Sequence, residues 1–338
     1  MTNVDEVYQR LSGTGPERDG WLSNHAPMAA EALIRHGQGA VVHRWLDAYA
    51  DRLEPRPRGI SPILAEDWRS PLGDPGRTGD WLVFFERELD LAPWRDVLVR
   101  WWPRLLPGIA AGVTHGVIRV GHAVRSLVDA ETPGRIAELG QGLAYWAGRW
   151  QPLAPPGAGP YPATDPRAAL DSMPRIPDQR SGARERLVQL AHTPGWADAS
   201  GAVPGAAADD APARLAEIVA AATLRHGTFG YASPVMLVHA ATAPSAVARV
   251  LPVLPQSLWM PSLTAAWAAT AAITAAYSPA TPRPLPASPP AGDLMELAAA
   301  GGDEHAIKFA DTALDVYART GSEQVLASAR HSVGLLGG

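Results

Sequence analysis

The residues best suited to chemistry lie near the C-terminus, in the segment Asp303-Glu304-His305-Ala306-Ile307-Lys308. Lys308 is the only lysine among the 29 lysine and arginine residues of the chain. A buried lysine amine can lose its proton and act as nucleophile, base or carbamate precursor, whereas arginine stays protonated. On a helix, His305 and Lys308 share one face because three residues separate them. The pattern favours a chemical role for Lys308, and the alternative is that one lysine has persisted by chance.

Histidines in separate predicted helices are the second chemical feature. His25, His115, His239 and His305 come from four segments, which is how helical bundles deliver metal ligands. Neutral imidazole suits iron, zinc, copper or nickel. A Glu-x-x-His pair is absent, so the only anionic ligand in line with His305 would be a carbamylated Lys308. Carbamylation requires a neutral amine, and metal coordination would then hold the carbamate in place.

One helix is predicted over residues 235–251, with His239 in its second turn. A polar stripe is predicted on another helix, over residues 109–125. At about 100° per residue it places His115, Arg119 and His122 within a narrow arc. Two histidines and an arginine on one stripe are also compatible with satisfied core residues. We interpret the five remaining histidines as structural: His36, His43, His192, His226 and His331.

The fold is predicted to be all-α, because no segment alternates with period two between hairpin turn signals. We expect a single large helical domain over residues 1–338, built of packed αα-hairpins, with residues 1–20 loosely ordered. Long proline-rich loops are expected over residues 55–79, 151–179 and 278–292. The loop over 151–179 is long enough to cover a site as a lid.

Composition excludes several classes of protein. The net charge of −5 and the scattered arginines do not favour nucleic-acid binding. With no cysteine, disulfides and thiolate-bound metals are excluded. The N-terminus lacks a signal peptide, and the longest apolar stretch, over residues 263–277, is shorter than the roughly 20 residues of a membrane span. We therefore expect a cytoplasmic protein without membrane contact.

The chain resembles the questin oxidase-like family across most of its length. Four segments carry the resemblance: Ser23-Asn24-His25-Ala26-Pro27-Met28, Thr114-His115-Gly116-Val117-Ile118-Arg119, Leu237-Val238-His239-Ala240-Ala241-Thr242 and Asp303-Glu304-His305-Ala306-Ile307-Lys308. The resemblance implies oxidative opening of an anthraquinone-type ring of an aromatic polyketide by O₂, as a Baeyer–Villiger or dioxygenase-type reaction. It further implies a non-haem Fe²⁺ ion held by His25, His115, His239, His305 and a carboxylated Lys308.

Two positions depart from the pattern of fungal family members. Those members tend to carry His where this chain has Arg119 and Tyr where it has His122. Arg119 is accordingly predicted to polarise a substrate carbonyl or stabilise a phenolate. His122 is predicted to support the metal ligands or to replace one of them. Twelve tryptophans could fill the core or form walls for the flat substrate.

Other functions stay open at this point. A hydrolase could use histidines with a carbamylated lysine, but such sites usually hold two metals on β/α barrels. A helical binding protein without chemistry is a second alternative. A metal-free, NADPH-assisted oxidase is a third, and NADPH could also serve the iron enzyme as external reductant, although no Gly-x-Gly-x-x-Gly follows a strand. A homodimer is compatible with the sequence.

Overall fold

Helices make up most of the computed structural model, which describes residues 3–157, 165–203, 207–286 and 292–337. The all-α prediction is confirmed. The chain divides into two compact units. Unit 1 comprises Met1–Pro152 with Pro252–Pro255, and unit 2 comprises Leu153–Leu251 with Gln256–Gly338. The expectation of one domain stays a prediction, because compact units can still unfold together.

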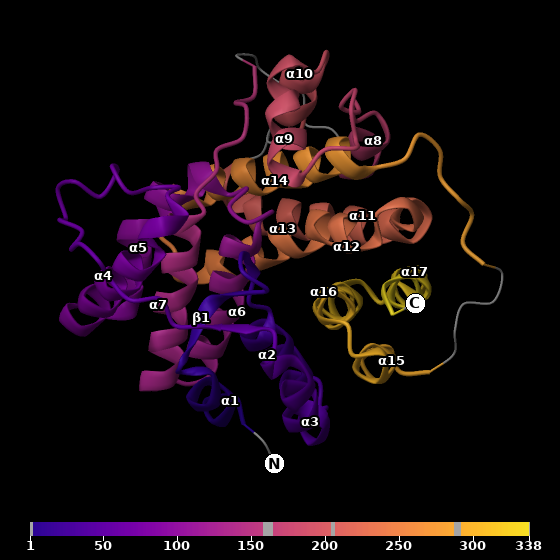
Figure 1. Cartoon of the computed structure of the whole chain (residues 1–338). Helices are drawn as coiled ribbons and strands as arrows, with labels where there is room; N and C mark the ends of the chain where they lie inside the picture. The colour runs from indigo at the N-terminus through magenta and orange to yellow at the C-terminus, as the bar shows by residue number, and fades with distance from the viewer. Residues whose placement is uncertain (1–2, 158–164, 204–206, 287–291, 338) are drawn as a thin grey trace. The chain divides into compact units, whose positions relative to one another are not determined.

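Unit 1 contains seven α-helices and a small sheet within its described residues (Figure 1). The helices and strands are α1 (Val4–Leu11), β1 (Thr14–Arg18), β2 (Leu22–Ser23), α2 (Ala26–Arg35), α3 (Gly39–Ala50), β3 (Leu53–Pro55), η1 (Pro75–Arg77), α4 (Thr78–Leu91), α5 (Trp94–Leu105), η2 (Leu106–Gly108), α6 (His115–Asp129) and α7 (Pro133–Gly148). β1 is the central strand of an antiparallel sheet of order β2-β1-β3, in which Glu17 pairs with Ser23 and Thr14 with Pro55.

The N-terminus differs from the expectation of a loosely ordered segment over residues 1–20. The Asn3 side chain caps α1 by accepting a hydrogen bond from the Glu6 backbone N–H. Val7 and Leu11 of α1 are buried, and β1 follows directly. This order arises because the short helix buries an apolar face and its first N–H groups have a cap.

The core of unit 1 is formed by α6 and α7 and by an aromatic cluster on α4 and α5. α6 and α7 approach closely, since a Cβ on Gly116 would lie 2.8 Å from the Cβ of Trp146. Trp81 stacks on Phe85 at 5.7 Å between ring centroids, and Trp101 meets both rings edge-on. These tryptophans therefore fill the core, which is their commoner role.

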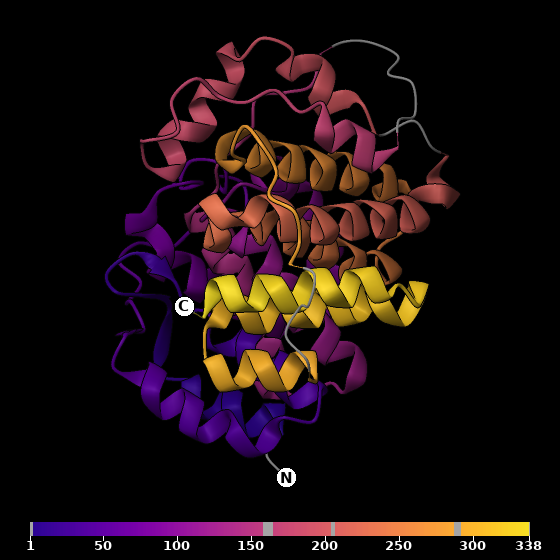
Figure 2. The ribbon, with the colours of Figure 1, turned by 90° about the vertical axis from the view of Figure 1, so that its right-hand side faces the viewer.

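Unit 2 contains the remaining helices, of which α15, α16 and α17 lie side by side (Figure 2). Its helices are α8 (Pro166–Asp171), α9 (Ala183–Val188), η3 (Gln189–His192), α10 (Trp196–Gly201), η4 (Ala208–Asp210), α11 (Ala211–Phe229), η5 (Gly230–Ala232), α12 (Pro234–Leu237), α13 (His239–Val250), η7 (Gln256–Leu258), α14 (Trp259–Tyr277), α15 (Leu294–Gly301), α16 (Glu304–Thr320) and α17 (Glu323–Leu336). The chain passes from unit 2 to unit 1 within η6 (Leu251–Val253).

The core of unit 2 relies on small residues at helix contacts. A Cβ on Gly227 of α11 would lie 2.2 Å from Ser328 Oγ of α17, so these helices meet where the glycine has no side chain. The alanine-rich α14 is buried over most of its length and packs against α13. By length and composition the segment Pro234–Val253 could cross a membrane, but 72% of its apolar window is buried, as in a core helix.

Two predicted helix boundaries were wrong, and both changes affect candidate residues. The helix expected over 109–125 begins only at His115, because Gly112, Val113 and Thr114 all have positive φ angles. The helix expected over 235–251 is divided at Val238, so His239 begins α13 instead of lying in a second turn. In the expected loop over 151–179, residues 165–171 form α8 with its cap, and residues 158–164 lie outside the described part.

Candidate metal centre

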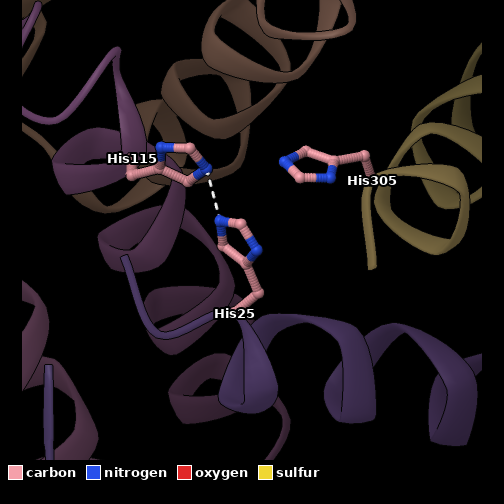
Figure 3. A group of neighbouring side chains, drawn as sticks. All are labelled: His25, His115 and His305. Atoms are coloured by element: carbon pink, nitrogen blue, oxygen red, sulfur yellow. Dashed lines mark hydrogen bonds between the residues drawn. The ribbon is translucent and has the colours of Figure 1, made fainter. Parts of the chain in front are cut away.

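Two histidines of unit 1 have their rings in contact (Figure 3). His25 is the N-cap residue of α2, and its backbone N–H donates to the Tyr49 hydroxyl at 3.1 Å. His115 is the first residue of α6. The Nε2 atoms of the two rings are 2.7 Å apart, and the ring centroids are separated by 4.5 Å. Both side chains are buried, so the pair is shielded from water.

A turn with unusual backbone angles positions His115. The φ angles of Gly112, Val113 and Thr114 are 53°, 56° and 70°. Positive φ is costly for a β-branched residue, about 1–3 kcal/mol in such regions. The turn also meets Tyr145, since a Cβ on Gly112 would lie 2.3 Å from its hydroxyl oxygen. Packing on α7 therefore helps to hold the turn that presents the imidazole.

The hydrogen bonds of His115 determine which nitrogen is available. Its Nδ1 lies 2.6 Å from the Gly112 carbonyl oxygen, and a carbonyl can only accept, so Nδ1 carries the proton. Nε2 then carries the lone pair and lies 2.7 Å from the Nε2 atom of His25. Two arrangements explain this short distance. In the first, His25 donates a hydrogen bond to Nε2 of His115. In the second, the Nε2 lone pairs of both rings point to one metal ion, because nitrogen ligands at about 2.0–2.1 Å from an ion lie roughly 3 Å apart.

Unit 2 holds the other group of predicted ligands. His239 and His305 have ring centroids 5.7 Å apart at an angle of 69°. Lys308 lies one turn beyond His305 on α16 and its residue is 1% exposed. Nδ1 of His239 is 3.1 Å from the Met236 carbonyl oxygen, which again leaves Nε2 with the lone pair. The Asp303 carboxylate caps α16 by accepting from the backbone N–H groups of His305 and Ala306 at 2.8 and 2.9 Å.

The electrostatics of this group favour neutral imidazoles. Burial lowers the pKa of His239 well below its usual value of 6.5, and the nearby Lys308 and His305 add to the effect. Burial also lowers the pKa of His305, which the Asp303 carboxylate partly offsets. Both rings are therefore neutral at pH 7, the state in which imidazole binds a metal.

His122 belongs to a charged network in unit 1. Its Nδ1 lies 2.7 Å from Oε2 of Glu31, and Nε of Arg125 donates to Oε1 of the same carboxylate at 2.8 Å. Burial alone would raise the pKa of Glu31, but Arg125 and His122 outweigh it and lower the pKa to about 2. The carboxylate is therefore ionised and orients the imidazole, as carboxylates do behind metal-bound histidines.

Arg119 is held by two other side chains of unit 1. Its Nε and Nη2 donate to the two Glu138 carboxylate oxygens at 2.6 and 2.8 Å, and Nη2 also donates to Gln141 at 3.1 Å. Nη1 is buried and has no hydrogen-bond partner among the described residues. One N–H edge of the guanidinium is thus left to meet another acceptor.

The structure brings the predicted residues together in two groups, one in each unit: His25 with His115, and His239 with His305 and Lys308. It adds three residues that the sequence did not identify as partners, Glu31, Glu138 and Gln141. No spacing signal could have revealed Glu31, since 91 residues separate it from His122. The cap of α16 was readable, because Asp followed by Glu at a helix start is a capping pattern.

The donor chemistry of both groups fits a transition-metal ion. Neutral imidazoles with Nδ1 on a backbone carbonyl present Nε2 in one fixed direction, which is the usual support of metal-bound histidine. His115 and His239 both have this arrangement. The donors come from the starts of four helices, α2, α6, α13 and α16, so the backbone positions them firmly.

The fold and the site together define an all-α protein in which buried imidazoles at helix starts could bind a metal. The chain matches the questin oxidase-like family over residues 22–312, a range that includes all five predicted ligands. No curated protein matches it. The chain belongs to the questin oxidase-like family, and this membership identifies it as an oxidoreductase of the oxygenase type that acts on anthraquinone-type polyketides.

Proposed function

We propose that the chain is a non-haem iron oxygenase that opens a ring of a hydroxyanthraquinone-like polyketide. The observation that carries the proposal is the anchoring of His115 and His239, whose Nδ1 atoms lie on backbone carbonyls and whose Nε2 atoms keep their lone pairs. Iron, zinc, copper and nickel all accept imidazole, and histidines with one carboxylate are typical ligands of Fe²⁺ in non-haem oxygenases. When bound, Fe²⁺ would supply electrons for the activation of O₂.

We further propose that Lys308 supplies the anionic ligand as a carbamate. In this step neutral Nζ forms a bond to the carbon of CO₂ and releases one proton, which gives a carboxylate at the end of the side chain. Lys308 is 1% exposed and lies near His239 and His305, and carbamylation requires its amine to be neutral. That one ion binds His25, His115, His239, His305 and Lys308 together stays a prediction.

The remaining residues would bind and orient the substrate. Nη1 of Arg119 would donate to a carbonyl or phenolate oxygen, while Glu138 and Gln141 hold the rest of the guanidinium in place. A fixed cation at that oxygen stabilises negative charge as it develops, without reorganisation. His122, oriented by Glu31, would move a proton or support the ligands.

Oxygen balance separates the two reaction types. In a dioxygenase both atoms of O₂ enter the product and no reductant is consumed. In a Baeyer–Villiger monooxygenase one atom is inserted next to the carbonyl, and the other leaves as water, with two electrons and one proton supplied by NADPH as hydride and a second proton supplied by solvent. Measuring NADPH consumed per O₂ consumed gives zero for the first and one for the second.

Metal analysis tests the proposal. Protein purified without chelator is expected to contain one iron per chain and to consume O₂ with a hydroxyanthraquinone. Replacing Lys308 with Arg keeps a cation but prevents carbamylation, so iron and activity should both be lost. Two zinc or nickel ions per chain would instead support the hydrolase, and full activity without metal but with NADPH would support the metal-free oxidase.

A matched control separates ligand loss from loss of a buried imidazole. His226 is buried in unit 2, with Nδ1 2.9 Å from Ser332 Oγ and Nε2 2.9 Å from the Pro234 carbonyl oxygen, and it is outside the predicted ligand set. We expect His226→Asn to lower stability but to keep its iron, whereas His239→Asn loses it. Equal iron in both variants would contradict the role of His239.

Labelled ¹³CO₂ should give a carbamate signal in the wild type that is absent from Lys308→Arg.

A further inference from the structure

A second site of unit 2 lies apart from the residues discussed so far. A cavity of about 520 Å³ is formed by α8, α11, the end of α14 and the segment after it. This volume is within the range of small-molecule pockets, roughly 300–1,000 Å³. None of the predicted metal ligands, and neither Arg119 nor His122, lines it.

Part of the cavity wall is apolar, and the rest is polar or charged. Leu170, Met173, Leu224, Phe229 and Leu285 contribute hydrophobic surface. Such walls gain free energy by covering the apolar body of a ligand. The cavity is therefore suited to an aromatic or aliphatic body.

The charged residues of the cavity are three arginines and one acid, Arg167, Arg175, Arg225 and Asp171. Asp171 pairs with Arg225, whose Cζ also lies 3.7 Å from the centroid of the Phe229 ring. Asp171 compensates the charge of only one of the three arginines, so the lining carries a net positive charge. Nε of Arg175 donates to the Ser278 carbonyl oxygen at 3.2 Å, which holds the guanidinium beside the cavity.

Two buried polar atoms at the cavity have no partner among the described residues. They are Oγ of Ser278, in a residue that is 2% exposed, and Nε of Arg225. Buried donors without an acceptor cost about 1–3 kcal/mol each, so such groups in native proteins usually meet a ligand or water. Both donors belong to the lining of one cavity.

We propose that this cavity binds a small amphipathic carboxylate. The guanidinium group of an arginine in the lining can donate two parallel hydrogen bonds to a carboxylate, and the Ser278 hydroxyl can donate a third. A single negative charge suits a site in which apolar walls cover the rest of the ligand, because burying a dianion there would cost more desolvation. The site does not depend on the iron chemistry proposed above.

Calorimetric titration of the full-length, metal-loaded protein tests the proposal, with 1-naphthoate as the probe. We expect saturable binding at one site, and binding of the isosteric neutral 1-naphthamide that is weaker by about tenfold or more. Inorganic phosphate should not displace the naphthoate. No saturation, equal binding of the amide, or tighter binding of phosphate would each overturn the proposal.

Variants of residues that line the cavity test whether naphthoate binds there. Arg175→Gln and Ser278→Ala should each weaken naphthoate binding, and Ala221→Met should block it by filling the cavity, while all three stay folded by circular dichroism. The Ser278 change removes a hydroxyl that has no partner, so it should not lower stability. Arg180→Gln is the charge-matched control, because Arg180 does not line the cavity and its side chain is 91% exposed. Wild-type affinity in the cavity variants, or equal weakening in the control, would refute the assignment.

Discussion

Neutralising Glu138 should destabilise the protein more than almost any other single-charge change. The Glu138 carboxylate takes two hydrogen bonds from Arg119, at 2.6 and 2.8 Å. The two side chains are 6% and 1% exposed. Glu138→Gln would leave the Arg119 charge buried without a counter-charge, while the 3.1 Å bond to Gln141 would stay.

The magnitude follows from burial. Removing one partner of a buried ion pair costs about 3–5 kcal/mol, because the remaining charge is not compensated. Replacing both partners with apolar residues of similar volume is often neutral or stabilising. We therefore expect Glu138→Gln and Arg119→Met each to cost about 3–5 kcal/mol, and Arg119→Met/Glu138→Leu to cost much less than the sum of the two.

Equilibrium unfolding in urea, followed by circular dichroism, measures these differences as shifts of the midpoint. The matched control is Glu217→Gln, since Glu217 pairs with Arg214 at 2.7 Å but its side chain is 54% exposed. Exposed pairs contribute about 0–1 kcal/mol, so the control should hardly move. The reasoning is refuted if Glu138→Gln costs no more than Glu217→Gln, or if the double variant loses the full sum.

Three further changes have outcomes set by local contacts. Asp80 accepts hydrogen bonds from Arg77 and two backbone N–H groups, which outweigh burial and hold its pKa below 3.8. Its stabilisation is therefore complete above pH 3.8 and lost as the pH falls through the folded-state pKa. Asp80→Asn should therefore lower the urea midpoint at pH 7, and the difference from the wild type should shrink as the pH falls below 3.8. Gly116→Ala should cost about 1–3 kcal/mol in thermal unfolding, because the new Cβ would lie 2.8 Å from Trp146 Cβ. Asp303→Ala should cost about 1 kcal/mol through the lost cap and should also lower the iron content, because it frees the start of α16 that carries His305.

Two of these changes have controls within the same chain. Gly134→Ala, in α7, places a Cβ no closer than 3.7 Å to Tyr8 Cβ of α1 and should be neutral or stabilising. Asp293 caps α15 with the same two backbone hydrogen bonds as Asp303 caps α16. Asp293→Ala should therefore lose similar stability but keep its iron. If both aspartate variants lose iron alike, the cap does not act through His305.

The sequence predicted the helical class and the residues on helices well, because periodicity and caps are local. α16 begins where Asp303 and Glu304 indicate, and α14 covers the expected alanine-rich stretch. The small sheet of unit 1 was not predicted, since its strands have two to five residues and no clear alternation. Pairing between β1 and β3 depends on contacts across about 40 residues, which local patterns do not report.

Partners of the candidate residues were harder to predict than the residues themselves. His122 and Arg125 are three residues apart and share a helix face, which the sequence indicates. Glu31, which holds both, is on α2 and reaches them only in the folded unit. The same holds for Glu138 on α7, which decides how much of the Arg119 guanidinium remains for a substrate.

The turn before His115 explains why one prediction failed and also why His115 stands out. Residues 109–114 have helical composition, so local propensity extends the helix through them. The structure instead holds Val113 and Thr114 at positive φ, which only tertiary contacts can sustain. In a helix that began at residue 109, the Gly112 carbonyl would accept from the backbone N–H four residues on. Because α6 begins at His115, that carbonyl accepts from the backbone N–H and Nδ1 of His115 instead. Backbone strain therefore fixes the tautomer that leaves Nε2 available for a metal, and the failure of local propensity points to the residue that the proposed chemistry needs.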